Sequence, residues 1–215
     1  DLCARPCEWL RIPVNITNLT EPVSGYQLSY TFSRPNLVSF DPIELFDVAG
    51  TATESWEYTS ATTQGGTTIR VVGIADMPDP PGTPPPIPPN GVPQRLVYMV
   101  AHVPCVPDTM SGNTVRLDPN LLLCSFTDPQ GMTLAPISVA GDSITVIATA
   151  LGDLDGSGHL DVVDVVRAVN CAFRGDCPAC AIKLVDTTCD QLINVQDIVK
   201  LIEAVFRGGA APVCP

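Results

Sequence analysis

Basic residues are scarce in this sequence of 215 residues. It holds 11 lysines and arginines against 23 aspartates and glutamates, so its net charge is −12. The only lysines are Lys183 and Lys200, and the only histidines are His102 and His159. An acidic protein repels the phosphates of nucleic acids and the headgroups of anionic lipids. The composition therefore argues against both as partners.

Long apolar runs and a leader segment are also missing. The sequence has no run of about 20 apolar residues, so no segment is predicted to span a membrane. It begins Asp1-Leu2-Cys3, without an initiator Met and without a charged and then apolar leader. We expect either a mature form that has lost a signal peptide or a recombinant piece.

Familiar catalytic patterns are absent as well. A Ser-His-Asp triad would have to use His102, whose place in the apolar run 100–103 favours a packed histidine. Carboxylates for glycoside hydrolysis could be drawn from Glu44, Glu54 and Glu57, but any acidic chain offers such pairs. The sequence therefore predicts no catalytic residue.

Cysteine, in contrast, is abundant, with nine residues. Their spacing does not suit zinc, because Cys177-Pro-Ala-Cys180 is the only Cys-x-x-Cys pair and histidine is rare. We therefore expect disulfides and an oxidising compartment. The candidates are Cys3, Cys7, Cys105, Cys124, Cys171, Cys177, Cys180, Cys189 and Cys214.

Several pairings fit these positions, and the sequence does not fix the connectivity. Cys3 could bridge locally to Cys7, and Cys105 with Cys124 could close a hairpin-like segment. Four cysteines could staple the insert between two acidic loops: Cys171, Cys177, Cys180 and Cys189. An odd number leaves one thiol free or bonded to another chain, and Cys214 is a candidate for it.

One of the acidic loops has the ligand spacing of an EF-hand. Residues 153–164 place oxygen donors at loop positions 1, 3, 5, 7, 9 and 12, with Gly158 at position 6. Calcium takes six to eight oxygen ligands, which this spacing can wrap around one ion. The predicted ligands are the side chains of Asp153, Asp155, Ser157, Asp161 and Asp164 and the backbone carbonyl of His159.

A second loop repeats this spacing 33 positions later, from Asp186 (186 − 153 = 33). Its predicted ligands are Asp186, Thr188, Asp190, Leu192, Asn194 and Asp197. Gln191 stands where glycine is expected, so either a left-handed glutamine or a distorted loop is required. Thr188 and Asn194 carry no charge, so we expect a lower calcium affinity here or an empty second site.

A helix is predicted after each loop, over Val162–Phe173 and Val195–Phe206. Apolar residues recur at helical spacing, so each helix has one face to bury: Val165, Val166, Val169 and Phe173, then Ile198, Leu201, Ile202 and Phe206. Each helix ends in Phe-Arg-Gly, where the arginine suits the negative end of the helix dipole and the glycine stops the helix. Two helices this short need calcium as a source of folding free energy.

Residues 152–208 resemble dockerin modules, which are duplicated calcium loop-and-helix units. The resemblance rests on the start Gly152-Asp153-Leu-Asp155-Gly, the duplicated loops and the paired helices. It implies two Ca²⁺ sites and a cohesin as partner. The pairs Val162-Val163 and Val195-Gln196 replace the Ser-Thr pair of the best-known type, which implies a more apolar recognition surface. Alternatively, these valines belong to the core. The candidate partner-binding residues are Val162, Val163, Val195, Gln196, Arg174 and Arg207.

The first 150 residues read as short strands broken by turns, without a helical period. Tyr26, Leu28, Tyr30 and Phe32 show the alternation most clearly. Strand candidates are 9–19, 26–32, 37–40, 56–60, 67–74, 96–103, 114–117 and 144–148. We predict a mainly β protein with a small α module. An antiparallel β-sandwich or jelly roll over 1–150 would precede the calcium module over 151–215.

Residues 77–93 hold nine of the 22 prolines. Such a segment cannot form a central strand, so we expect a polyproline II excursion between two strands. It is either a stiff surface loop or an arm that docks on a neighbouring molecule.

The order of strands resembles a cohesin, the sandwich partner of dockerins. The resemblance rests on Ile12-Pro13-Val14-Asn15-Ile16, on Gly25–Tyr30 and on Leu37-Val38-Ser39-Phe40; the step after Tyr30 and the proline-rich insert depart from it. It implies a secreted, non-enzymatic protein, extracellular or on a cell surface. Other copies would then bind head to tail in a fibre or tube. The alternatives are an accessory or carbohydrate-binding module on a separate cohesin-bearing scaffold, with polysaccharide as a ligand, and an enzyme of unfamiliar type.

Overall fold

The computed structural model describes residues 2–18, 20–75, 85–105, 113–135, 138–147, 150–177 and 180–214. The chain divides into two compact units. We call Cys7–Pro104 with Val115–Ile144 the sandwich unit, and Asp1–Pro6, Cys105–Thr114 and Thr145–Pro215 the helical unit. These units differ from the predicted limits of 1–150 and 151–215, because the N-terminal residues group with the helices. A disulfide from Cys3 to Cys180 and a hydrogen bond from the Ile147 N–H to the Ala4 carbonyl hold them there.

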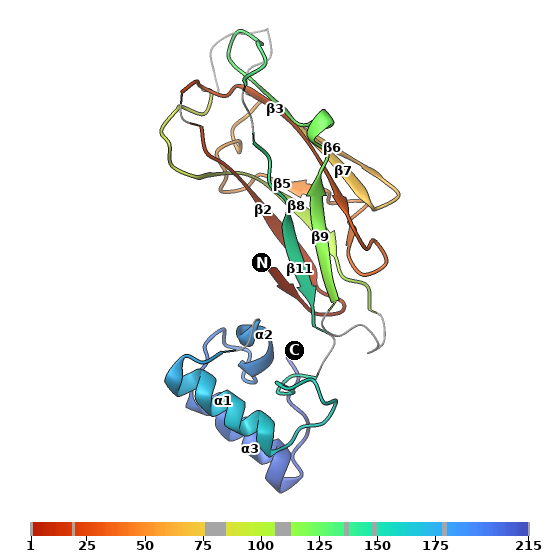
Figure 1. Cartoon of the computed structure of the whole chain (residues 1–215), viewed down its shortest axis with the longest axis vertical. Coiled ribbons are helices and arrows are strands. Elements are labelled where there is room, and N and C mark those ends of the chain that lie inside the picture. The colour runs from red at the N-terminus through yellow and green to blue at the C-terminus, as the bar shows by residue number, and fades with distance from the viewer. Residues whose placement is uncertain are drawn as a thin grey trace. The chain divides into compact units, whose positions relative to one another are not determined.

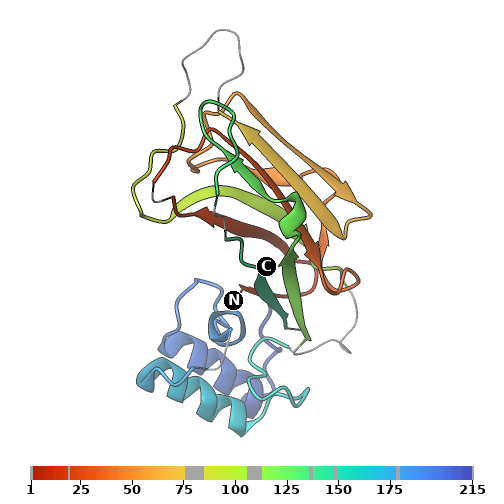
Figure 2. The ribbon, with the colours of Figure 1, turned by 45° about the horizontal axis from the view of Figure 1, so that its top comes forward.

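The sandwich unit has two layers of strands (Figures 1 and 2). In one layer β8 (Gln94–His102) pairs with β2 (Trp9–Ile16) on one side and with the short β4 (Ser39–Phe40) and β5 (Phe46–Asp47) on the other. The other layer has the order β11 (Asp142–Val146), β9 (Asn113–Pro119), β3 (Gly25–Phe32), β7 (Thr68–Ile74), β6 (Tyr58–Gln64), with β10 (Ser125–Thr127) paired to β3. The β2–β8, β3–β7 and β6–β7 pairs are antiparallel. The predicted β-sandwich is confirmed.

Alternating apolar residues explain which face of each strand is buried. In β2 the buried side chains are those of Leu10, Ile12, Val14 and Ile16, and in β3 they include Tyr26, Leu28, Tyr30 and Phe32. The short strands β1 (Leu2–Ala4), β5 and β10 were not predicted, because two or three residues show no alternation. A 3₁₀ turn, η1 (Leu121–Leu123), precedes β10.

Part of the proline-rich segment is anchored to the sandwich. Ile87 is 2% exposed, and its backbone exchanges two hydrogen bonds with that of Val23, at 2.9 and 2.8 Å. The Asn18 amide donates to the Ile87 carbonyl at 3.2 Å. Residues 77–84 lie outside the described residues, so the docking arm stays a prediction there.

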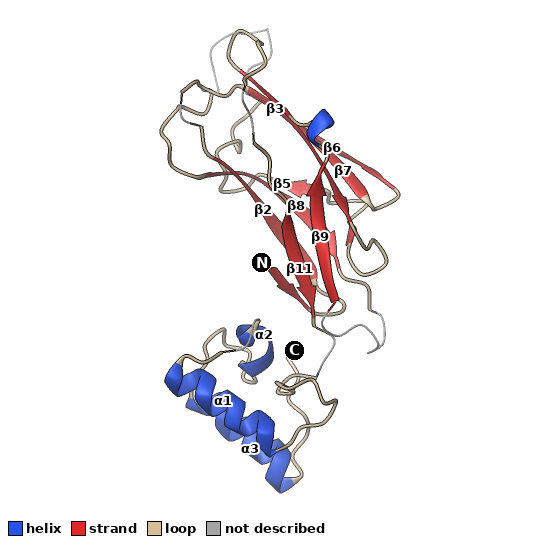
Figure 3. Cartoon of the chain, viewed as in Figure 1, coloured by secondary structure: helices blue, strands red, loops and turns tan. Residues whose placement is uncertain are grey.

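The helical unit contains α1 (Val162–Arg174), α2 (Ala181–Val185) and α3 (Val195–Arg207), shown in Figure 3. The two predicted helices are confirmed, and the five-residue α2 was not predicted. Gly175 and Gly208 end α1 and α3 with left-handed φ values of 69° and 65°, as the Phe-Arg-Gly pattern predicts. The core of the unit is small and consists mainly of Ile147, Leu154, Val165, Ala168, Cys171, Leu184, Val185, Ile198 and Leu201. None of the helices in the described part of the chain is long and apolar enough to cross a bilayer.

Three disulfides lie wholly within the helical unit: Cys3–Cys180, Cys171–Cys177 and Cys189–Cys214. Cys7 and Cys105 are disulfide-bonded as well, and Cys124 is free and buried.

Three pairing predictions are therefore wrong. Cys3 does not bridge to Cys7, Cys124 does not bridge to Cys105, and Cys214 is not the unpaired thiol. Cys124 points into the sandwich, where its sulfur contacts the backbone N–H and carbonyl of Ser29 at 3.5 and 3.7 Å. Partners far apart in the sequence meet only through the fold, so linear spacing could not reveal them.

Candidate calcium loops and helix surface

The first loop brings three acidic side chains together. Asp153, Asp155 and Asp164 each offer a carboxylate oxygen, and these oxygens lie within 4.8 Å of one another. Asp153 is 1% exposed and Asp164 is fully buried. Like charges held this close are unfavourable where two of them are buried, and a cation between them would offset the repulsion.

Backbone N–H groups of the loop orient the Asp153 carboxylate. One oxygen accepts from Gly156 and Ser157 at 2.9 and 3.1 Å, and the other accepts from Gly158 at 2.9 Å. A carboxylate offers about four lone-pair sites, so an acceptor site remains for a cation.

The Asp164 carboxylate closes the same loop from the first turn of α1. Its Oδ1 accepts from the N–H groups of Leu154 and Asp155 at 2.7 and 3.3 Å, and its Oδ2 accepts from Asp161 at 2.9 Å. The Asp161 side chain in turn caps the helix by accepting from the Val163 N–H at 2.7 Å. Asp161 and Asp164 thus form a capping box. The sequence could have indicated this motif, because a capping residue is followed three positions later by an acidic one.

The predicted ligands at positions 5 and 7 also lie together. The Ser157 hydroxyl donates to the His159 carbonyl at 3.1 Å. Side-chain and backbone hydrogen bonds from Ser157 hold the pKa of the Asp155 carboxyl below its usual value, which keeps that exposed group ionised. The donor set consists of hard oxygens, which suits Ca²⁺.

The second loop repeats this hydrogen-bond pattern. Asp186 accepts from the N–H groups of Asp190 and Gln191 at 3.1 and 2.8 Å. Asp197 accepts from Thr188 and Asn194, each at 2.9 Å. The structure therefore places these predicted ligands as it places their counterparts in the first loop. Leu192, the predicted ligand at position 7, is exposed.

The two loops reach this shape with different residues. Gly156 and Gly158 have φ values of 74° and 83°, and the equivalent Cys189 and Gln191 have φ values of 64° and 66°. Of the two alternatives for Gln191, the structure shows the left-handed one. A side chain in this conformation costs about 1 kcal/mol more than glycine.

A basic side chain braces each loop from the helix that follows it, which the sequence reasoning missed. Arg167 donates to the Leu154 carbonyl at 3.1 Å, and Lys200 donates to the Thr187 carbonyl at 2.6 Å. Both cations stand three residues after the last acidic ligand, so comparing the two repeats could have found them.

Each long helix also exposes a row of apolar side chains. We call Val162, Val166, Val169 and Phe173 the first stripe, and Val195, Val199, Ile202 and Phe206 the second stripe. These side chains are 37–67% exposed. The stripes are equivalent, because each residue of the second lies 33 positions after one of the first. Such exposed apolar rows are typical of protein interaction sites.

These exposures correct two expectations. Val166, Val169, Phe173, Ile202 and Phe206 were expected to be buried and are not, because the small core is filled by the adjacent helix face with Val165, Ile198 and Leu201. The alternative that Val162, Val163 and Val195 belong to the core is wrong, since all three are more than 40% exposed. The other candidate partner-binding residues are exposed as well: Gln196, Arg174 and Arg207.

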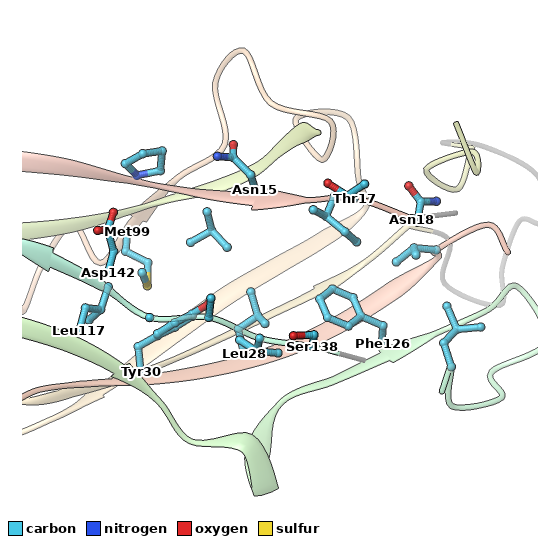
Figure 4. A pocket seen from close by; sticks show the side chains of 18 of the residues that line it. Asn15, Thr17, Asn18, Leu28, Tyr30, Met99, Leu117, Phe126, Ser138 and Asp142 are labelled. Atoms are coloured by element: carbon cyan, nitrogen blue, oxygen red, sulfur yellow. The ribbon is translucent and has the colours of Figure 1, made fainter. Parts of the chain in front are cut away.

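The sandwich unit has a cavity of about 790 Å³ between its layers. Side chains of Leu28, Tyr30 and Phe126 lie along it (Figure 4). Burial raises the pKa of Tyr30 to about 12, with the nearby Cys124 adding to the effect. Asp142 also lines the cavity, which makes it a poor place for an anion.

The outer face of β2 and β8 carries aromatic and basic side chains. The rings of Trp9 and His102 lie 4.5 Å apart, which agrees with a packed histidine. The guanidinium groups of Arg11 and Arg95 lie 4.2 and 4.7 Å from the ring centre of Tyr98. The three glutamates weighed as catalytic carboxylates are exposed: Glu44, Glu54 and Glu57.

No protein-family profile and no curated protein matches this chain. Solved structures do match it. The sixth cohesin of scaffoldin B from Acetivibrio cellulolyticus, solved with the Cel5 dockerin, has a TM-score of 0.53 at 10% identity and covers 67% of this chain and 93% of its own. The third ScaC cohesin of that organism, solved with the ScaB dockerin, has a TM-score of 0.51 at 13% identity and covers 68% and 95%. CaCohA2 from Clostridium acetobutylicum has a TM-score of 0.50 at 16% identity and covers 69% and 88%.

The sandwich has a cohesin-like fold. The resemblance inferred from the strand order is confirmed at the level of the fold, which is all that such low identities show.

Proposed function

We propose that this protein is a secreted, non-enzymatic assembly protein in which the helical unit of one copy binds the sandwich unit of another. The observation that carries the proposal is the pair of exposed, equivalent stripes on α1 and α3. They stand in one chain with a cohesin-like sandwich, and two of the similar cohesins named above were solved with dockerins. The disulfides support an oxidising, extracellular location.

Calcium binding is part of this proposal. Asp153, Asp155, Ser157, Asp161, Asp164 and the His159 carbonyl would hold the first ion, and the equivalent residues from Asp186 to Asp197 would hold the second. A bound ion supplies positive charge among buried carboxylates, which stabilises the loops. Each helix begins directly after its loop, so the loop fixes where the stripe starts.

The geometry of such a contact favours a polymer. A helical unit that binds a sandwich unit makes a heterologous contact, because the two surfaces differ. After one contact, one copy still has a free helical unit and the other a free sandwich unit. Repeated binding therefore forms a fibre, a tube or a closed ring.

Electron microscopy of the pure protein, with calcium and then with excess chelator, tests the proposal. We expect fibres, tubes or rings that form only with calcium. The variant Val166→Glu with Val199→Glu should remove them, because it places charges in both stripes. Ile182→Glu is the matched control, since Ile182 is an exposed apolar residue of α2 outside the stripes. Single particles under all conditions would overturn the proposal.

A mixing experiment separates head-to-tail binding from contacts between two stripes. The Val166→Glu, Val199→Glu variant keeps its sandwich unit, so it should cap wild-type polymers and shorten them when added in equal amount. A stripe-to-stripe contact would leave the variant out, and the polymer length would not change.

Polysaccharide binding is a second candidate function, favoured by the exposed Trp9. This residue is 58% exposed at one end of the β2–β8 face, and its ring offers an apolar surface to a sugar ring. Affinity electrophoresis in gels that contain soluble polysaccharides would show retarded migration, which Trp9→Ala should remove.

A further inference from the structure

We infer that the Cys189–Cys214 disulfide is a positioning element of the second calcium loop, whereas the first loop holds its shape without one. The inference rests on the proposed calcium sites. The disulfide would set the calcium affinity of the second site.

The starting observation is the contrast in backbone chemistry. Both loops need left-handed residues at positions 4 and 6, and the first loop has glycine at both. The second loop has Cys189 and Gln191 there, each of which prefers a right-handed or extended backbone. Without a restraint, these two residues would favour a relaxed loop that no longer points its ligands at one ion.

The disulfide supplies such a restraint. It joins position 4 of the loop to Cys214, 25 residues later. The chain turns back after α3 through the left-handed Gly208 and a hydrogen bond from the Gly209 N–H to the Glu203 carbonyl at 3.1 Å. The covalent ring therefore encloses four of the six predicted ligands: Asp190, Leu192, Asn194 and Asp197.

The first half of the unit contains a natural control. Cys171–Cys177 joins the last turns of α1 to the segment after it, with a separation of six residues. Its ring begins after Asp164 and encloses no predicted ligand. Removing it should leave both loops intact, so the two disulfides separate a general loss of stability from a specific effect on the second loop.

Calcium titration of the full chain by calorimetry tests the inference, with Asp155→Asn and Asp190→Asn, at exposed predicted ligands, assigning the sites. In Cys189→Ala with Cys214→Ala we expect the second-site affinity to fall about tenfold, while the first site changes less than twofold. Cys171→Ala with Cys177→Ala should retain both affinities within twofold.

A rescue variant identifies the mechanism. Cys189→Gly with Cys214→Ala also lacks the disulfide but accepts the left-handed backbone, so it should recover most of the lost affinity. If the alanine pair loses helical circular dichroism, Gln191→Gly in the intact protein replaces it, and this variant should raise the second-site affinity severalfold.

The outcomes distinguish the inference from the proposal beneath it. Equal second-site affinity with and without the disulfide overturns the inference and leaves the calcium sites standing. Binding of one ion only, in the first loop of the wild type, overturns it too. Calcium binding in neither loop would instead overturn the proposed function.

Discussion

The two units of this protein are stabilised in different ways. The sandwich unit buries large side chains between two layers, among them Leu28, Phe32, Phe40, Leu96 and Met99. The helical unit has a small core, so buried carboxylates, capping boxes and disulfides must hold its loops and helices. A unit too small to bury all its apolar residues leaves some on its surface, and here they form two equivalent stripes.

Loss of a loop carboxylate should have one of the two largest effects on this contrast. Asp164→Ala leaves three backbone N–H groups without their acceptor and removes a predicted calcium ligand, so we expect the helical unit to lose about 3–5 kcal/mol. Circular dichroism at 222 nm follows the helices, whereas both tryptophans, Trp9 and Trp56, lie in the sandwich unit. As the variant unfolds, the circular dichroism signal of the helices should be lost first, while the tryptophan emission of the sandwich unit is retained. Simultaneous loss of both signals would show that the units do not unfold independently.

Removal of the disulfide with the large sequence separation of 177 residues should have an effect of similar size. Cys3–Cys180 closes a loop of 177 residues, and loop entropy alone predicts a loss of about 5 kcal/mol for Cys3→Ala with Cys180→Ala. Cys171–Cys177 spans six residues, and the same argument predicts about 2 kcal/mol for its removal. Urea unfolding of both double variants gives the comparison. Equal losses would contradict the entropic account.

A cavity made in the sandwich core should destabilise the sandwich unit only. Leu28→Ala removes a fully buried side chain of β3, and we expect the sandwich to lose about 3 kcal/mol. Calcium titration of the variant should match that of the wild type. A changed calcium affinity would show that the sandwich core supports the loops.

Alkaline pH should weaken the sandwich unit. Burial raises the pKa of Tyr26 and of Tyr30 to about 12, against 10 for an exposed tyrosine. Folding favours the protonated form, so this stability is present below pH 10 and is lost as the pH rises from 10 to 12. Tyrosine absorbance and tryptophan emission, followed against pH, check the sign. Tyr30→Phe should flatten the loss, whereas the exposed Tyr58→Phe should not.

The smallest expected effect lies within the helical unit. Gln191→Gly should stabilise the second loop by about 1 kcal/mol, because glycine accepts the left-handed φ of 66°. The mirror change, Gly158→Gln, should destabilise the first loop by a similar amount. Thermal unfolding in chelator measures both without a contribution from calcium. Effects of the same sign would show that the two loops are not equivalent in shape.

Much of the secondary structure could be predicted from the sequence. Alternation in Trp9–Ile16 and Gly25–Phe32 predicts strands because every second side chain must be buried, and the 33-residue repeat predicts two equal loops and helices. Short elements such as β5 and α2 could not be predicted, since their few residues show no period.

The sequence by itself determined the acidic loops, the helix ends at Gly175 and Gly208 and the strand pattern, because each depends on neighbours within a few residues. Only the tertiary structure decided which cysteines pair and which apolar residues remain exposed. Cys3 meets Cys180, and Phe173 and Phe206 stay on the surface, because packing space in a small core is shared among residues far apart in the chain.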